Sequence, residues 1–169
     1  MNADTSSSTP LPPLASECHL RPATVADLAH VCSWFSDAEQ LQLWAGPYLA
    51  WPPQLDALIE QIDFLAQPAF GLFINDFGLA GFAQLQASGE RYHFARVAIA
   101  PSARGRGYGG QLLAAIIARH PQASGFSLYV YRHNQAAWRC YHKLGFSLKT
   151  APANADTDAG CVLLERNNG

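Results

Sequence analysis

The sequence predicts a single domain of mixed α and β structure (α+β), in which helices flank one central, mostly antiparallel sheet of about six to seven strands. The chain has 169 residues, a length typical of one domain with a sizeable core. Hydrophobic residues make up 49% of it and charged residues 14%, as in a globular protein. Apolar residues recur at helical spacing in some segments and form short strand-like runs in others.

The first element of the domain is expected after an unstructured start. Residues 1–16 are rich in Ser, Thr and Pro and offer little apolar surface, so we expect a disordered tail. The domain itself is expected at 17–166, beginning with a short strand at 18–22. Thr24 followed by Asp27 is typical of a capped helix start, and apolar residues then fall on one helical face.

Two further helices and a hairpin are expected next. A short helix is expected at 36–44, and Gly and Pro residues end it within 45–53. Residues 53–67 carry apolar side chains every three or four positions after an initial Pro, which predicts an amphipathic helix. Strands at 69–74 and 78–86 then form the expected β-hairpin.

The second half of the chain alternates strands and helices. A strand at 92–100 ends in four apolar residues, Val-Ala-Ile-Ala, as in a strand covered on both faces. A glycine-rich loop leads from it into a helix at 108–119, and the next strand is expected at 125–131. The remaining expected elements are one helix and two strands, at 134–145, 146–150 and 161–166.

The bulk properties exclude several functional classes. A formal net charge of −2 and a pI near 6.3 argue against a nucleic-acid partner, which requires a concentrated basic surface. No apolar run reaches the ~20 residues of a membrane helix, and the N-terminus does not have the pattern of a secretory signal. The four cysteines form no CxxC pair and the histidines lack metal-ligand spacing, so we expect no metal and a cytoplasmic location.

The segment PSARGRGYGG (101–110) places two arginines and four glycines between a strand and a helix. Three interpretations are open: a flexible nucleic-acid-binding segment, an ordinary turn or an anion-binding loop. The negative net charge of the chain disfavours the first. The first amides of a helix lack internal partners, and glycines let an anion approach the backbone. Arg104 and Arg106 would add charge, so we favour an anion site. The spacing fits neither a dinucleotide-binding fingerprint nor a P-loop.

Two segments resemble one known family. VAIAPSARGRGYGGQLL (97–113) resembles the acetyl-CoA-binding segment of the GNAT N-acetyltransferase superfamily, whose signature is Arg/Gln-x-x-Gly-x-Gly/Ala after a buried strand. LYVYRHNQAAWRCYHKLGF (128–146) is similar to the family's strand–Asn–helix–Tyr–Gly-Phe segment. The resemblance covers most of 18–166. It implies a GNAT-like domain with a sheet splayed at the cofactor site, acetyl-CoA as cosubstrate and an amine-bearing acceptor.

The resemblance also implies roles for individual residues. The backbone of Val97, Ala98 and Ile99 would hold the pantetheine arm like an added strand. Asn134 would lie beside the pantetheine, and Tyr141 would lie near the thioester sulfur. The loop that holds the pyrophosphate would comprise Arg104, Gly105, Arg106, Gly107, Tyr108, Gly109 and Gly110.

The chemistry of amine acetylation requires a proton acceptor and a proton donor. An alkyl ammonium of pKa ~10.4 is only about 0.04% neutral at pH 7, a cost of about 4.6 kcal/mol unless deprotonation is assisted. Tyr141 is the candidate donor to the leaving thiolate; a tyrosine that only packs against the sheet is the alternative. The spacing places Tyr141 on one helical face with Asn134 and Trp138.

The sequence indicates the general base less clearly than it indicates the proton donor. Some relatives use a Glu on the strand before the glycine loop, and His93 stands at the matching position. Others use a Glu five residues before the Asn, where this chain has Tyr129. A histidine can accept a proton at neutral pH, so His93 is the candidate catalytic base, with water-relayed deprotonation as the alternative.

The sequence leaves the acceptor open. Trp44, Tyr48 and Trp51 lie where relatives have acceptor-site loops, and would either wall an amine pocket or clamp two helices together. No acidic cluster stands out to bind a polycation, although four acidic residues are near in sequence: Asp37, Glu39, Asp56 and Glu60. A polyamine, a drug, an amino acid, a peptide N-terminus and a lysine are all compatible acceptors.

The leading hypothesis is an acetyl-CoA-dependent N-acetyltransferase that acts by direct transfer in a ternary complex. No cysteine lies in a motif that suggests an acyl-enzyme route. A non-catalytic module that binds acyl-CoA is the second hypothesis, because neither base position is Glu. The oligomeric state is open, with a homodimer among the outcomes.

Overall fold

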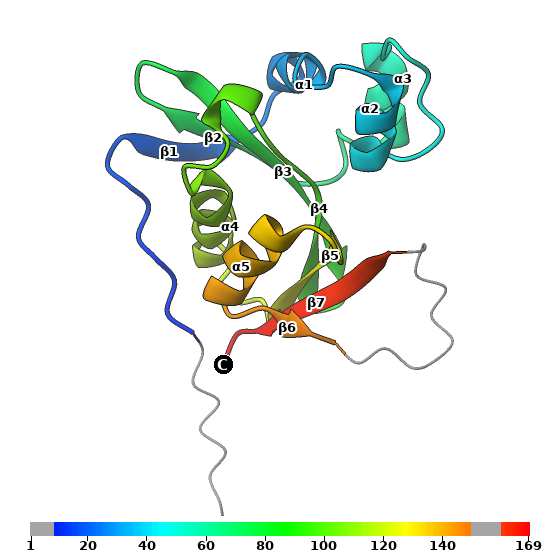
Figure 1. The fold of residues 1–169 in the computed structure, drawn as a ribbon. Helices are drawn as coiled ribbons and strands as arrows, with labels where there is room; N and C mark the ends of the chain where they lie inside the picture. The colour runs from blue at the N-terminus through cyan, green and yellow to red at the C-terminus, as the bar shows by residue number, and fades with distance from the viewer. Residues whose placement is uncertain (1–8, 150–159) are drawn as a thin grey trace, which may run out of the picture.

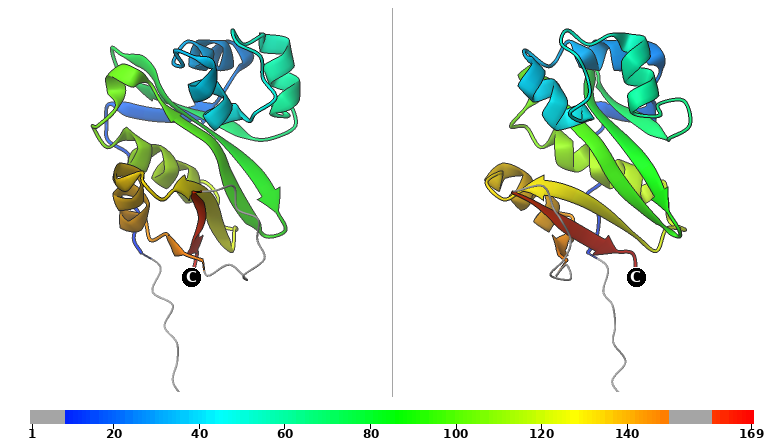
Figure 2. Two further views of the ribbon diagram at one scale, coloured as in Figure 1. Left: turned by 45° about the vertical axis from the view of Figure 1, so that its right-hand side comes forward. Right: turned by 90° about the vertical axis from the view of Figure 1, so that its right-hand side faces the viewer.

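The computed structural model describes residues 9–149 and 160–169, which form one seven-stranded sheet with helices on both faces. The strand order is β1-β2-β3-β4-β5-β7-β6, and only β4 and β5 pair in parallel. Helices α1, α2 and α3 cover one face, and α4 and α5 cover the other (Figures 1 and 2). The expected fold class is confirmed.

The elements follow the expected order along the chain. They are β1 (Cys18–Pro22), α1 (Val25–Cys32), α2 (Ala38–Ala45), α3 (Leu55–Gln61), β2 (Ala69–Ile74), β3 (Gly78–Ser88), β4 (Arg91–Ile99), η1 (Pro101–Ala103), α4 (Tyr108–Ala118), β5 (Gly125–Tyr131), α5 (Gln135–Lys143), β6 (Ser147–Leu148) and β7 (Cys161–Asn167).

The largest difference from the expected boundaries is at α3. The apolar periodicity predicts a helix over 53–67, but α3 ends at Gln61. Asp63 has a φ of +50°, which turns the chain out of the helical path. Leu65, which continues the apolar pattern in the sequence, is consequently 79% exposed. The periodicity could not show this end because the turn depends on one backbone angle.

The segment expected to be a disordered tail, 1–16, lies partly outside the described residues. The part that the structure describes, from Thr9 onward, forms no helix or strand. It is nevertheless attached to the domain. The buried Arg166 donates from Nη2 to the Thr9 carbonyl at 2.9 Å, and the Ala15 amide donates to Gln111 Oε1 at 3.1 Å. A buried guanidinium needs acceptors, and the backbone of this segment supplies one of them.

The pairing of β3 with β4 contains a β-bulge. Phe82 lies opposite Ala98, whereas Gln84 lies opposite Ala95, so β4 carries one more residue than β3 over this stretch. Within it, Arg96 has a φ of +53°, in the left-handed region that few non-glycine residues adopt. A bulged strand bends, and β4 therefore changes direction at Arg96.

The parallel pairing of β4 with β5 stops just before the bulge. Arg91–Phe94 pair with Gly125–Leu128, and residues 95–99 have no partner on this side. β5 itself continues to pair with β7 as far as Tyr131. The sheet therefore opens between β4 and β5, as the expected splay requires. No helix in the described part of the chain is long and apolar enough to cross a membrane.

Helix α1 starts with the expected capping box. The Asp27 amide donates to Thr24 Oγ1 at 3.2 Å, and the Thr24 amide donates to Asp27 Oδ2 at 2.7 Å. Arg21 also donates to both carboxylate oxygens, at 2.7 and 3.1 Å. Burial alone would raise the pKa of Asp27, but the hydrogen bonds from Arg21 and Thr24 outweigh it and hold this pKa below its usual value.

We predict that Asp27→Asn lowers the free energy of unfolding by about 1 kcal/mol at pH 7, because the carboxylate caps the helix and accepts from Arg21. A lowered folded-state pKa stabilises the protein above the unfolded-state value of about 3.9, and this contribution is lost as pH falls through the folded-state value. Urea unfolding of both proteins from pH 7 to pH 3 should show the difference shrinking. A difference that does not change with pH would contradict the assignment.

Candidate active site

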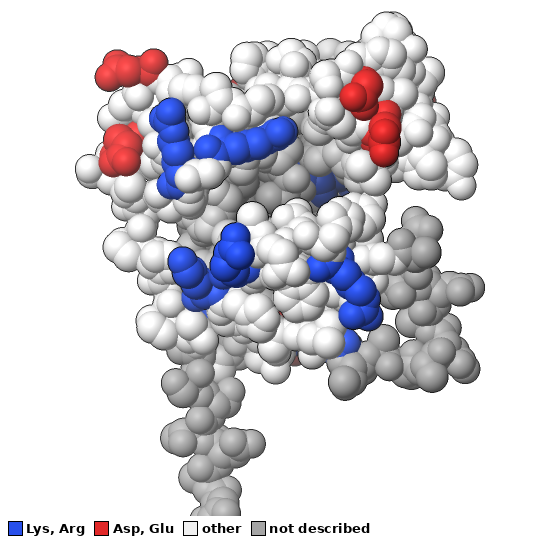
Figure 3. Space-filling view, in the orientation of Figure 1, with Lys and Arg blue, Asp and Glu red and all other residues white. Residues whose placement is uncertain are grey.

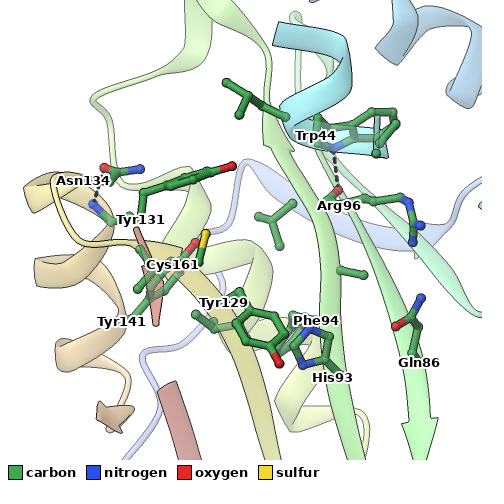
Figure 4. Close-up of a pocket in the computed structure, with 18 residues that line it drawn as sticks. Trp44, Gln86, His93, Phe94, Arg96, Tyr129, Tyr131, Asn134, Tyr141 and Cys161 are labelled. Carbon is green, nitrogen blue, oxygen red and sulfur yellow. Dashed lines mark hydrogen bonds between the residues drawn. The ribbon is translucent and has the colours of Figure 1, made fainter. Parts of the chain in front are cut away.

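Two cavities meet where β4 and β5 part. One, the loop-side groove, has a volume of about 570 Å³ and runs along the end of β4 between the glycine-rich loop and α5. The other, the sheet-side cavity, has a volume of about 420 Å³ and lies among α2, β4, β5 and the start of β7 (Figure 4). Six residues line both cavities, so the two are adjacent: Leu43, Trp44, Val97, Asn134, Ala137 and Tyr141.

The backbone at the end of β4 offers free hydrogen-bonding groups to the groove. The Ala100 amide donates to the Ala80 carbonyl at 2.8 Å, so Ala100 and Ala98 are bonded toward β3. Hydrogen-bonding direction alternates along a strand, so the N–H groups of Val97 and Ile99 point toward the gap left by β5. An extended, amide-containing chain can therefore pair with this edge in the way that an added β-strand would.

The loop that follows β4 is held against the strand. Arg104 donates from Nε to the Ile99 carbonyl at 3.1 Å, which fixes its side chain beside the groove. Gly107, with a φ of +83°, is the N-cap residue of α4, and a Cβ placed on it would meet nothing within 4 Å. The backbone here is therefore open toward the groove, in a conformation that favours glycine.

The N-terminus of α4 has the geometry of an anion-binding site. No side chain caps it, and the amides of Tyr108, Gly109 and Gly110 have no acceptor among the described residues. Such amides, together with the helix dipole, favour a negative group. The groove is lined by Arg104, Gly105, Gly107, Gly109 and Gly110 from this region.

Two predicted loop residues lie outside the groove lining. Arg106 is exposed and is not among the lining residues. Tyr108 is half-buried and packs against the core. Its contribution to an anion site is therefore limited to its backbone amide.

Helix α5 supplies the opposite wall of the groove. The Asn134 side chain caps it, accepting from the Ala137 amide at 3.1 Å, which leaves its Nδ2 group free of that bond (Figure 4). Trp138 does not share the groove face as the spacing suggested: its Nε1 donates to the Tyr131 carbonyl at 3.3 Å. Ala137, a small residue, takes that place and leaves room beside Tyr141.

Tyr141 lies where the two cavities join. Its ring packs against Phe146 at 6.2 Å between centroids, and its hydroxyl has no hydrogen-bond partner among the described residues. Burial, with a smaller effect of the neighbouring Cys140, raises the pKa of Tyr141 to about 12. The hydroxyl is therefore protonated at neutral pH and can donate a proton into the cavities.

His93 lines the sheet-side cavity together with Tyr141. Its Nδ1 lies 2.9 Å from Ser127 Oγ, and its ring lies 5.1 Å from that of Tyr129, centroid to centroid. Burial lowers the pKa of His93, so the ring is neutral at pH 7 and can accept a proton. The structure thus places His93, a neutral imidazole, and Tyr141, a protonated hydroxyl, from separate segments in the lining of one cavity.

Of the three aromatic residues considered for an acceptor site, Trp44 is the one that lines these two cavities. Its Nε1 donates to the Arg96 carbonyl at 2.8 Å, and its ring contacts Phe82 at 5.7 Å between centroids, so it both packs and forms a wall. Tyr48 is 83% exposed and Trp51 is 41% exposed, and neither lines these two cavities.

The residue that sequence reasoning missed is Arg96. It lines the sheet-side cavity, as does Gln86 from β3 (Figure 4). The available signal was an arginine inside an otherwise apolar strand, FARVAIA. Among the described residues no group of three or more His, Cys, Asp or Glu is placed to hold a metal ion.

The chain belongs to the GNAT family of acetyltransferases. Residues 31–146, well over half of its length, match the model of the acetyltransferase (GNAT) family. This family contains acetyl-CoA-dependent N-acetyltransferases, and the chain is an enzyme of that class.

Three solved acetyltransferases share the fold. A spermidine N-acetyltransferase from Vibrio cholerae in complex with CoA and spermine is 18% identical, with a TM-score of 0.71 over 91% of this chain and 97% of that one. The PaiA N-acetyltransferase from Thermoplasma acidophilum, in complex with coenzyme A, is 21% identical, with a TM-score of 0.63 over 89% and 98%. The ribosomal-protein-S18-alanine N-acetyltransferase from Escherichia coli is 19% identical, with a TM-score of 0.61 over 90% and 94%.

Proposed function

We propose that this enzyme transfers the acetyl group of acetyl-CoA directly to a primary amine while both substrates are bound. The observation that carries the proposal is the continuous path through the split sheet. It begins at the uncapped N-terminus of α4, follows the unpaired edge of β4 and reaches the Tyr141 hydroxyl. The sheet-side cavity then gives an acceptor access from the other side.

The residues along the groove fit coenzyme A. The free amides at the start of α4 and the Arg104 side chain would hold the pyrophosphate. The N–H groups of Val97 and Ile99 would hold the amide-containing pantetheine arm, with Asn134 beside it. A pyrophosphate needs hydrogen-bond donors and positive potential, which the start of α4 offers. The pantetheine arm needs a strand edge, which β4 offers next along the groove.

Bound acetyl-CoA supplies a thioester, whose carbonyl carbon forms a bond to the amine nitrogen as its bond to sulfur breaks. Whichever of the Val97 and Ile99 N–H groups the arm leaves free would be available to the carbonyl oxygen as it gains negative charge. Tyr141 would donate its hydroxyl proton to the sulfur as the carbon–sulfur bond breaks. The raised pKa of Tyr141 keeps the proton in place until then. The thiol formed has a pKa of about 8.5, below that of Tyr141, so the tyrosinate regains a proton, which the amine nitrogen releases as the amide forms.

The amine must lose a proton to attack. His93, neutral and lining the same cavity, is the base we propose, acting directly or through water. We do not propose an acyl-enzyme route, because no cysteine lies in a motif that suggests one. In the loop-side groove, burial raises the pKa of Cys140, which makes it a protonated, poor nucleophile at neutral pH.

The sequence alone also allowed a non-catalytic module that binds acyl-CoA, because His93 and Tyr129 stand where relatives have a Glu base. The match to the acetyltransferase family favours the enzyme. Release of free CoA thiol with any member of a panel of amines tests the transfer that we propose.

We predict that Tyr141→Phe lowers kcat by about 100-fold or more, because the thiolate loses its proton donor, while the Kd for CoA changes less than about twofold. Stopped thiol-release assays and calorimetric titration with CoA measure the two quantities. Tyr48→Phe, at an exposed position outside both cavities, is the matched control and should keep full activity. Full activity of Tyr141→Phe would remove Tyr141 from the mechanism.

The pH dependence tests the base. If His93 takes the proton of the bound ammonium, log kcat/KM should rise with a slope of about one up to the lowered pKa of His93 and level off above it, because the protonated ring cannot accept a proton. In His93→Gln this break should be absent and the slope should stay near one, because activity then follows the free amine alone. No alkaline loss from Tyr141 is expected up to about pH 10, since its pKa is about 12. A break at the same pH in both proteins would exclude His93.

A further inference from the structure

The sheet-side cavity has an unusual charge for an amine-binding site. None of the described residues that line it is Asp or Glu, and His93 is neutral, so Arg96 is its one fully charged side chain. On the face shown in Figure 3, red acidic groups lie at the edges and blue basic groups border the central hollow. A polycationic acceptor would meet like charge here and no carboxylate.

Arg96 is held in place by two hydrogen bonds, and a third fixes the side chain that accepts from its guanidinium. The Trp44 indole donates to its carbonyl at 2.8 Å, at the bulge where Arg96 adopts its positive φ. Its Nη1 donates to Gln84 Oε1 at 2.9 Å, and Gln84, fully buried, donates from Nε2 to the Ile62 carbonyl at 2.9 Å. The guanidinium is therefore positioned before any substrate binds.

The charge of Arg96 is not balanced within the described part of the chain. No Asp or Glu there forms an ion pair with it. Its Nε is buried without a partner, and its Nη2 has no acceptor among the described residues. Burial lowers the pKa of this guanidinium, yet an arginine stays charged in a protein. A partly desolvated cation without an anion is unfavourable, and an anionic ligand would relieve that cost.

We propose that the acceptor is a small amine that also bears a carboxylate, an amino-acid-like molecule, and that Arg96 binds the carboxylate. This inference rests on the proposed function. Figure 4 shows Gln86 and His93, from neighbouring strands, on the same side of the cavity as the Arg96 side chain. The Gln86 amide can donate to the same carboxylate, and His93 lies where it can receive the proton of the amine.

The first test compares matched acceptors with the wild-type enzyme. A panel of L-amino acids, their carboxamides and the corresponding decarboxylated amines is assayed for thiol release from acetyl-CoA, with spermidine as the polycation. We expect kcat/KM for the best acid to exceed that of its amide and its decarboxylated amine by about 10- to 100-fold, because a charge-assisted contact is lost.

The second test removes the cation. Arg96→Gln should lower kcat/KM for the acid by about 10- to 100-fold, mainly through KM, and leave the amide within about twofold. Arg96→Lys, which keeps the charge, should recover part of the loss. Arg132→Gln is the control for loss of one charge, since Arg132 is exposed and lines neither cavity at the split. An unchanged Kd for CoA shows that each variant is folded.

The outcomes separate this inference from the proposed function. Amides or spermidine used as well as acids by the wild type would overturn the inference and leave the acetyltransferase standing. Equal losses for acid and amide in Arg96→Gln would also overturn it. Absence of thiol release with every amine in the panel would count against the proposed function itself. If Arg96→Gln does not fold, the wild-type ratio of acid to amide and the Arg96→Lys variant decide.

Discussion

The constraint on which the site depends is the parting of β4 from β5. A parallel pair that continued past Phe94 and Leu128 would bond every backbone group of β4 and close the sheet. The extra residue in β4, with Arg96 in the left-handed region, bends the strand away instead. Because a strand edge without a partner leaves N–H and C=O groups unsatisfied, this opening favours an extended ligand in the gap.

The surrounding structure keeps the split open and gives its two sides different characters. Trp44 from α2 donates to the backbone at the bulge, and the buried Gln84 from β3 holds the Arg96 side chain. On the loop side, free helix amides and Arg104 provide positive potential. On the sheet side, the neutral imidazole of His93 and one arginine line a cavity that contains no acidic side chain among its described residues. Tyr141 borders both.

The order of elements and the glycine-rich loop could be predicted from the sequence because each depends on local signals. Apolar periodicity marks helices and strands, and glycines mark the loop. The bulge and the early end of α3 could not be predicted, since each depends on one positive φ at a non-glycine residue. The sequence also left open whether Trp44, Tyr48 and Trp51 wall a pocket or clamp two helices together, because tertiary packing decides which aromatic side chain lines a cavity.

Backbone amide hydrogen exchange, followed residue by residue with and without CoA, tests the central claim most directly. If the split sheet is the cofactor site, CoA should slow exchange at least about tenfold at Val97, at Ile99 and at the first three amides of α4. The amides that pair β1 with β2, far from the gap, should change little. Unchanged exchange at the β4 edge and the α4 N-terminus in the presence of bound CoA would contradict the account.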